Sequence, residues 1–159
     1  MEQNHRRTIR FKLNGRTAIT EIATHETLLE VLRRDFSLFG GRESCGQGLC
    51  GCCTAIVDGI AVSGCLYLAA FVDGAEVTTV EGLASGGKLH SIQESFIANC
   101  GFQCGFCTPG FILMTKELLE RHPQPTTDEI RHYLSGNLCR CAAYPDIIRA
   151  VKAAAGEKC

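Results

Sequence analysis

The chain has 159 residues, a formal net charge of −1 and a hydrophobic share of 45%. This length suits one large domain or two small ones, and the hydrophobic share is that of a folded globular chain. The small net charge gives no electrostatic reason to expect binding to nucleic acid or to a membrane surface. No apolar run approaches the ~18 residues that a membrane span needs, so we expect none.

The first residues resemble an export signal only superficially. Arg6-Arg7 could begin a twin-arginine signal, but such a signal needs an apolar stretch behind it. Arg10 and Lys12 interrupt that stretch, so we expect a cytoplasmic protein. In that reducing compartment, eleven cysteines indicate metal sites rather than disulfides.

The N-terminal half shows the patterns of a small sheet. Ile9, Phe11 and Leu13 alternate with polar residues, and Asn14-Gly15 then favours a hairpin turn into a second strand over Arg16–Ile22. Apolar residues at helical spacing between residues 28 and 36 predict one helix. Three further stretches have strand composition: Thr54–Val57, Ile60–Ser63 and Glu76–Val80. The Asp58-Gly59 hairpin signal lies between the first two, so we predict an α+β domain over residues 1–80.

A glycine-rich linker candidate, Gly82–Lys88, precedes a helical pattern. Four helix starts are indicated by capping or first-turn residues: Ser91-x-x-Glu94, Thr108-Pro109 (Thr108 as N-cap), Thr126-x-x-Glu129 and Tyr144-Pro145. Three helix ends are indicated, at His122-Pro123, Gly136 and Gly156. Short helices with short connections predict an all-α four-helix bundle over residues 81–159. We interpret Glu117, Glu120 and Arg121 as part of a solvent-exposed helix face.

Eight of the eleven cysteines form two sets of four. The first set is Cys45, Cys50, Cys53 and Cys65. Its Cys-x4-Cys-x2-Cys spacing is that of a plant-type [2Fe–2S] site, whose cluster needs four soft thiolates around a compact core. Glycines crowd this loop and allow its backbone N–H groups to turn toward the sulfurs. Zinc sites also use Cys-x2–4-Cys pairs, but the loop pattern favours iron–sulfur.

The second set combines a Cys-x2-Cys pair with a Cys-x-Cys pair: Cys104, Cys107, Cys139 and Cys141. A Cys-x2-Cys pair occurs in zinc sites, and in redox motifs near a βαβ unit, whereas helices surround this one. The one-residue spacer of the other pair is short for zinc. From the residues alone, a cluster and a zinc ion both remain possible here.

The predicted helix order brings this second set together. In an up-down-up-down bundle, the loop joining the first two helices and the loop joining the last two lie at the same end. One loop carries Cys104 and Cys107, and the other carries Cys139 and Cys141, so we expect all four to converge. Thr108-Pro109 and Tyr144-Pro145 start helices just after them, and positive helix N-termini near thiolates are favourable.

Three cysteines are left over. Cys52 adjoins a predicted ligand and could compete with Cys53 for iron, although its spacing fits less well. We assign Cys100 to packing and Cys159 to a free thiol near the chain end. The sequence has no Gly-x-Gly-x-x-Gly and no Walker loop, so we expect no nucleotide or flavin site on this chain.

Three motifs together resemble the small iron–sulfur subunit of the xanthine dehydrogenase family of molybdenum hydroxylases. They are Cys45-Gly-Gln-Gly-Leu-Cys50-Gly-Cys-Cys53-Thr, Gln103-Cys-Gly-Phe-Cys107-Thr-Pro-Gly110 and Gly136-Asn-Leu-Cys-Arg-Cys141. The resemblance covers about residues 9–151. It departs at Ser44, Cys52 and Ala142-Ala143, none of which is a ligand position.

The resemblance implies a ferredoxin-like (β-grasp) N-terminal domain and a four-helix bundle, each with one [2Fe–2S] cluster held by its own four cysteines. It also implies two partners, a large molybdopterin-binding subunit and a medium FAD-binding subunit. Electrons would pass between molybdenum, the bundle cluster, the ferredoxin-domain cluster and FAD. Gln103 and Cys141 would approach the pterin, and no residue of this chain would be catalytic.

Three hypotheses therefore compete at this point. The first is an electron-transfer subunit of a heteromeric molybdenum-containing oxidoreductase. The second is a free-standing carrier with two clusters, and the third is a binding module stabilised by zinc. The sequence does not identify the substrate, which would bind on another chain.

Overall fold

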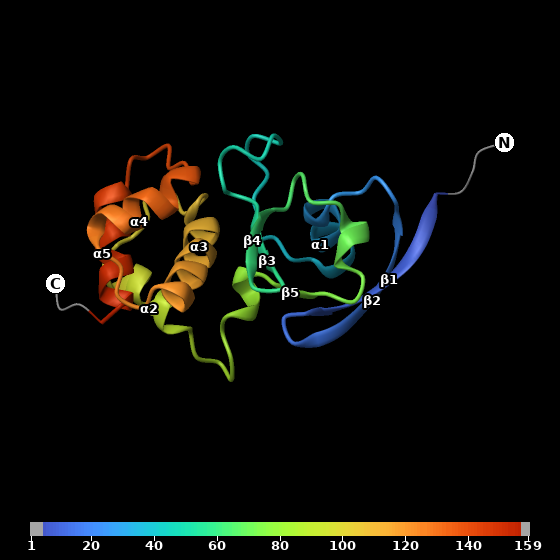
Figure 1. Cartoon of the computed structure of the whole chain (residues 1–159), viewed down its shortest axis with the longest axis horizontal. Coiled ribbons are helices and arrows are strands. Elements are labelled where there is room, and N and C mark those ends of the chain that lie inside the picture. Colours follow the sequence, from blue (N-terminus) through green and yellow to red (C-terminus); the bar gives the residue numbers. More distant parts are fainter. Residues whose placement is uncertain (1–4, 157–159) are drawn as a thin grey trace.

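The computed structural model describes residues 5–156. Figure 1 shows a sheet with helix α1 (Leu28–Phe36) at one end of the molecule and a group of helices at the other. The fold is therefore α+β, as the sequence predicts. No helix in the described range has the length and hydrophobicity needed to cross a bilayer.

The sheet is mixed, with strand order β2-β1-β5-β3-β4. Its strands are β1 (Arg6–Leu13), β2 (Arg16–Ala23), β3 (Thr54–Val57), β4 (Ile60–Ser63) and β5 (Glu76–Thr78). Strands β1 and β5 pair in parallel, and the other neighbours pair antiparallel. Helix α1 begins with a capping box between Thr27 and Glu30, which satisfies two backbone N–H groups at its start.

Both predicted hairpin turns are confirmed. Asn14 and Gly15 have φ of 51° and 76°, and Asp58 and Gly59 have φ of 48° and 79°. Positive φ at both central residues is the conformation that matches the twist of the flanking strands. The last strand, β5, is shorter than predicted because the side chain of Asn14 accepts the N–H of Thr79 at 2.8 Å.

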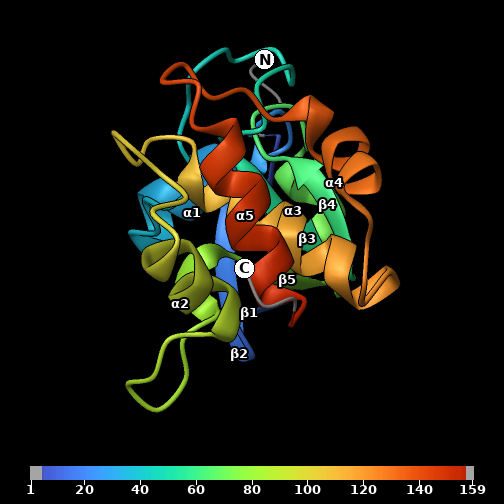
Figure 2. The ribbon, with the colours of Figure 1, turned by 90° about the vertical axis from the view of Figure 1, so that its left-hand side faces the viewer.

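The helical region contains α2 (Ser91–Ala98), α3 (Thr108–Arg121), α4 (Thr127–Tyr133) and α5 (Tyr144–Ala154). Seen from the helical end, α5 lies between α2 and α4 (Figure 2), and α3 packs on β3 and β4. The N-cap of α4 is Thr126 with Glu129, as predicted. Two predicted starts are wrong by one residue, since the cap of α2 is His90 rather than Ser91, and Thr108 is the first residue of α3 rather than its cap.

The shift at α2 has a simple cause. The ring nitrogen Nδ1 of His90 accepts the N–H of Ile92 at 3.2 Å, and the side chain of Gln93 accepts the N–H of His90 at 2.9 Å. A histidine therefore takes the role that the sequence pattern assigned to a serine. The predicted ends before His122-Pro123 and near Gly156 are confirmed, with α3 ending at Arg121 and Gly156 at φ of 88°.

One predicted surface residue is in fact buried. Glu117 is only 4% exposed, and its Oε1 accepts the N–H of Ala61 on β4 at 3.1 Å and an N–H of Arg121 at 2.6 Å. The prediction of a solvent-exposed face is thus wrong for Glu117, because α3 packs against the sheet on that side. Glu117 joins the helices to the sheet through a charge-assisted hydrogen bond.

The buried residues form two clusters. The cluster between the sheet and α1 runs from Ile9 to Val77 and lies wholly in the N-terminal half. The cluster among the helices also includes Cys50, Cys52 and Ile56 of the N-terminal half. The first cysteine loop is therefore partly buried by the helices.

Candidate metal centres

The first cysteine quartet lies in the segments that precede β3 and follow β4. Cys45, Cys50 and Cys53 come from the loop before β3, and Cys65 follows β4. Gly46, Gly48 and Gly51 have φ between 62° and 71°, a backbone conformation that favours glycine. This conformation turns backbone N–H groups toward sulfur, since Gln47 and Leu49 both donate to the Cys45 Sγ at 3.4 Å.

Within this quartet the thiols lie in two pairs. The Cys45 thiol interacts with that of Cys50, and the Cys53 thiol interacts with that of Cys65. The N–H of Gln47 and then that of Leu49 lower the pKa of Cys45 to about 6. Burial raises the pKa of Cys53 to about 11. Cys45 is thus prepared as a thiolate, whereas Cys53 ionises readily only beside a cation.

The second quartet forms from two separate loops. Cys104 and Cys107 precede α3, and Cys139 and Cys141 precede α5. The structure places the Cys104 thiol near that of Cys141, and the Cys107 thiol near that of Cys139. The four predicted ligands therefore meet at one end of the helices, again as two pairs.

The electrostatics of the second quartet repeat those of the first. The N–H of Phe106 lowers the pKa of the exposed Cys104, and burial raises the pKa of Cys107 to about 12. The N–H of Ala143 donates to the Cys139 Sγ at 3.4 Å, and the Cys139 N–H donates to the Tyr144 hydroxyl at 2.9 Å. The Ala143 N–H, at the N-cap of α5, thus faces the Cys139 sulfur.

These residues fit a binuclear iron–sulfur cluster. Four cysteines in two pairs match its requirement, because each of the two irons takes two thiolates. Within residues 5–156, no group of three or more His, Cys, Asp or Glu side chains is arranged to hold a single metal ion. Next to Cys107, the buried Thr108 Oγ1 has no hydrogen-bond partner in the described part of the chain, so it is free to donate to a sulfur.

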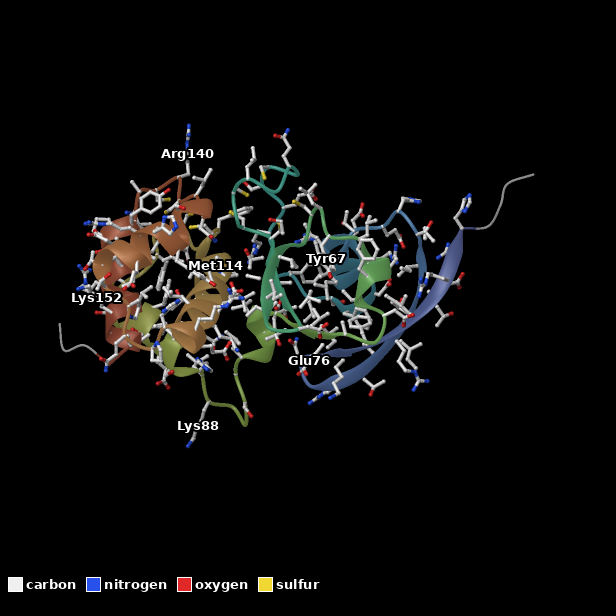
Figure 3. All side chains as sticks on the ribbon, in the orientation of Figure 1. Tyr67, Glu76, Lys88, Met114, Arg140 and Lys152 are labelled. Carbon is white, nitrogen blue, oxygen red and sulfur yellow. The ribbon has the colours of Figure 1, made fainter. Side chains whose placement is uncertain are left out.

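Gln103 and Cys141, which the resemblance places near the pterin, are both accessible to solvent at least in part. Gln103 is exposed beside Cys104, and Cys141 is half-buried. Arg140, between Cys139 and Cys141, projects away from the molecule (Figure 3). Cys100 is exposed with φ of 52°, so its prediction as a packing residue is wrong, and Cys159 lies outside the described residues.

Cys52 is buried between the two quartets. Its Sγ lies 3.8 Å from the carbonyl oxygen of Cys50, and it belongs to the helical core cluster together with Cys107. Burial raises the pKa of the Cys52 thiol to about 12, which keeps it protonated at neutral pH. Its burial in that cluster, together with its neutral state, describes a packing residue.

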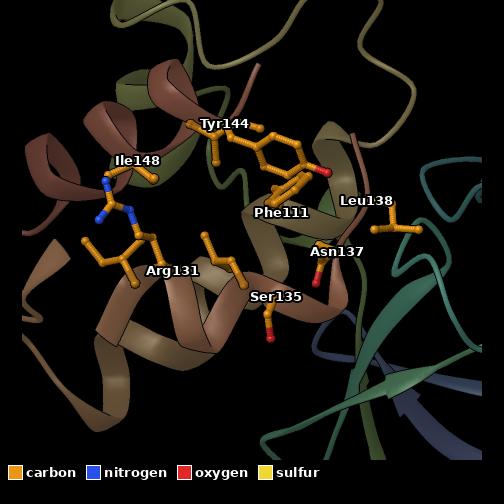
Figure 4. A pocket seen from close by; sticks show the side chains of 10 residues that line it. Phe111, Arg131, Ser135, Asn137, Leu138, Tyr144 and Ile148 are labelled. Carbon is orange, nitrogen blue, oxygen red and sulfur yellow. The ribbon is translucent and has the colours of Figure 1, made fainter. Parts of the chain in front are cut away.

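An apolar pocket of about 300 Å³ lies beside the second quartet (Figure 4). Phe111, Leu134 and Ile147 supply much of its apolar wall, and Tyr144, which the Cys139 N–H contacts, also lines it. Asn137 and Leu138 form the side nearest the strands. The segment that carries Cys139 therefore lies between the sheet and this pocket.

Comparisons with known proteins identify both halves. Residues 11–84 match the family of 2Fe-2S iron–sulfur cluster binding domains, and residues 79–152 match a second family of [2Fe-2S] binding domains. The nicotine 6-hydroxylase small subunit of Paenarthrobacter nicotinovorans is 47% identical over 92% of this chain and 88% of its own length. The chain belongs to the iron–sulfur subunits of the molybdenum hydroxylase family.

Other relatives of this iron–sulfur subunit agree in sequence and structure. The aldehyde oxidoreductase iron-sulfur-binding subunit PaoA of Escherichia coli is 43% identical over 92% of this chain and 70% of its own length. The crystal structure of quinoline 2-oxidoreductase from Pseudomonas putida 86 contains a chain that superposes with a TM-score of 0.92 at 38% identity. That match covers 96% of this chain and 95% of the other.

Membership in this family decides between the three hypotheses. Both family matches are to [2Fe–2S]-binding domains, which leaves the zinc-stabilised module without support. Relatives that match over most of their length are subunits of oxidoreductases. The chain is therefore an iron–sulfur electron-transfer subunit of an oxidoreductase complex rather than its substrate-binding chain.

Proposed function

We propose that this subunit relays electrons between a molybdopterin centre on a large partner subunit and FAD on a medium partner subunit. The observation that carries the proposal is the presence of two thiol quartets, each arranged as two pairs, in loops that contact each other. A [2Fe–2S] cluster bound to each quartet supplies a centre that accepts and releases an electron.

We assign the first cluster to a ferredoxin-like domain over residues 1–80 and the second to a four-helix bundle over residues 81–159. The ligands of the first are Cys45, Cys50, Cys53 and Cys65, and those of the second are Cys104, Cys107, Cys139 and Cys141. The thiol interactions support this division, because Cys45 interacts with Cys50, Cys53 with Cys65, Cys104 with Cys141 and Cys107 with Cys139, each within its own quartet. We expect the complex to act in the cytoplasm.

Exposed apolar side chains near both quartets support the proposal that partner subunits bind there. Leu49 and Leu66 are 66% and 59% exposed near the first quartet. Near the second quartet, Phe102, Phe106 and Leu138 are between 40% and 53% exposed. Exposed apolar side chains that cluster around a site mark surfaces that another protein covers. Gln103 and Cys141 are accessible on the second of these surfaces, where we place the pterin of the large subunit.

Metal analysis and electron paramagnetic resonance test the ligand division. The assembled complex should contain about four irons and four acid-labile sulfides in this chain, two of each per cluster. Cys107→Ser should remove the signal of one cluster and leave the other. Cys100→Ser is the matched control, since Cys100 is exposed and lies outside both quartets, and it should leave both signals. Zinc without sulfide, or loss of both signals from a folded Cys107→Ser variant, would contradict the assignment.

Co-purification tests the partners. The subunit should be isolated together with a flavin-containing chain and a molybdopterin-containing chain. Isolation of a fully loaded subunit alone, able to exchange electrons with small carriers, would favour the free-standing carrier instead.

A further inference from the structure

The two cysteine loops contact each other directly. The N–H of Leu138 donates to the carbonyl oxygen of Cys50 at 3.0 Å. Leu138 precedes Cys139 in the chain, so this hydrogen bond connects a predicted ligand of the first quartet to the residue before a predicted ligand of the second. Fewer bonds separate the two quartets here than along the chain itself.

A side chain reinforces this contact. The Nδ2 of Asn137 donates to the carbonyl oxygen of Gly51 at 3.3 Å, and Thr54 Oγ1 on β3 donates to the same oxygen at 2.7 Å. Asn137 is only 4% exposed. Its own N–H donates to the carbonyl of Leu134 at 2.9 Å, which fixes it to the turn after α4. The Gly51 peptide is therefore held from both halves of the molecule.

Two glycines make the approach possible. A Cβ added to Gly110, in the first turn of α3, would lie 2.1 Å from the Gly51 carbonyl oxygen. A Cβ added to Gly51 would lie 2.4 Å from the Asn137 Nδ2. Backbone meets backbone at this point, and any side chain would push the two loops apart. We call Gly51, Gly110 and Asn137, with the Cys50–Leu138 hydrogen bond, the inter-loop clamp.

The cysteines around the clamp are also buried. Cys50, Cys107 and Cys139 are between 6% and 8% exposed and share one core cluster. The Cys52 side chain, 3% exposed, fills space in the same cluster. Close packing of this kind transmits small displacements, because a filled interior has few alternative arrangements.

We propose that Asn137 is a positioning residue that sets the separation of the two iron–sulfur clusters. Its amide holds the Cys139 segment against the Gly51 peptide, and the Cys50–Leu138 hydrogen bond is the short connection between the two ligand sets. The proposal rests on the proposed ligand division. It adds that the spacing is held by the inter-loop clamp rather than by the chain connecting the two halves.

Two variants break the clamp in chemically different ways. Asn137→Asp keeps the side-chain size but replaces the donor with a carboxylate that faces a carbonyl oxygen. Asn137 lines the pocket, so the carboxylate has space to move without displacing a packed side chain. Gly110→Ala inserts a methyl group at the contact. Gly136→Ala is the matched control, because a Cβ there meets nothing within 4 Å.

The measurement is the magnetic interaction between the two reduced clusters in the assembled complex, read from the splitting of their electron paramagnetic resonance signals. This interaction falls with the cube of the distance between the clusters. We expect Asn137→Asp and Gly110→Ala to retain both clusters with a reduced splitting and slower electron exchange between them. Gly136→Ala should keep the wild-type splitting.

Two results would overturn the inference. Wild-type splitting in both variants, with iron content intact, would show that the clamp does not set the spacing. Loss of a cluster from both variants would show that these residues retain the clusters rather than space them. A wild-type complex that lacks iron and sulfide would instead contradict the proposed function itself, so the two failures are distinguishable.

Discussion

Three cysteines of the first quartet come from a single loop, whereas the second quartet takes two cysteines from each of two loops separated by α3 and α4. The first therefore depends mainly on local backbone conformation, with glycines at positive φ and N–H groups aimed at Cys45. The second depends on the packing of α3 against α4 and α5. A substitution in the core far from the cysteines should therefore affect the cluster of the second quartet more than that of the first.

The largest expected effect comes from removing the link between α3 and α5. Phe111 is fully buried, and its ring meets that of Tyr144 edge-on with centroids 6.3 Å apart. Phe111→Ala should cost about 3–5 kcal/mol of stability and should release the second cluster before the first. Iron content and the two resonance signals during denaturant titration would check the order of loss.

The matched variant in the other half is Phe11→Ala. Phe11 is 2% exposed and meets Phe36 edge-on at 5.7 Å, so its loss should cost a similar amount. Because the first quartet is local, we expect no selective loss of the first cluster in a folded Phe11→Ala protein. If the first cluster were lost as readily as the second is in Phe111→Ala, the contrast between local and long-range sites would be wrong.

The next effect sharpens how strongly the helices depend on the sheet. Glu117→Ala leaves the Ala61 N–H without its acceptor and should cost about 1–3 kcal/mol. Glu120→Ala is the matched control, because Glu120 is also a glutamate of α3 but has a 57% exposed side chain. It should change stability by less than about 0.5 kcal/mol. Denaturant unfolding of the two variants measures the difference, and equal midpoints would show that the Glu117 contact contributes nothing.

A smaller expected effect comes from removing a helix N-cap, which can be compared between the two halves. Thr27 and Thr126 each form a capping box at the start of a helix. Replacing either by alanine should cost about 1 kcal/mol. Thr126→Ala should also weaken retention of the second cluster, whereas Thr27→Ala should affect neither cluster selectively. Chelator-challenge rates for each cluster in the two variants would test this asymmetry.

The smallest effect is a dependence on pH that arises around Arg34 in the sheet half. The Arg34 guanidinium lowers the pKa of Glu26 and of Asp35 through side-chain hydrogen bonds. A lowered carboxyl pKa contributes stability that is present above the ordinary values of 4.5 and 3.8 and is lost as pH falls through the lowered ones. Arg34→Gln should flatten this acid dependence by less than about 1 kcal/mol, since the group is partly exposed. Melting temperatures across this pH range would show it, and an unchanged profile would contradict it.

Local patterns predicted much of this fold because local physics decides those positions. The Asn14-Gly15 and Asp58-Gly59 turns require residues that accept positive φ, and the Thr126 capping box satisfies N–H groups within its own helix turn. The sequence does not predict His90 as the N-cap of α2 because histidine is an uncommon N-cap, although Gln93 stands where a capping box needs it.

Contacts between the halves were not predictable in the same way. Glu117 is polar, and its burial follows from the packing of α3 on two sides. A second stripe at helical spacing, Gly110 and Leu113, was the signal that could have revealed this face. The sequence shows Asn137 only as part of a cysteine motif, because its partner Gly51 lies far away in sequence. The ligand roles themselves stay predictions from spacing and family membership.

The shared core has a consequence for modular engineering. Cys50, Cys52 and Ile56 belong to the N-terminal half in sequence, yet they pack in the core of the helices. A hybrid that joins the sheet half of one relative to the helices of another would have to transplant these residues together with the helices. The segment to exchange therefore does not start at the linker, because it must also include the residues of the first cysteine loop and β3 that pack in the helical core.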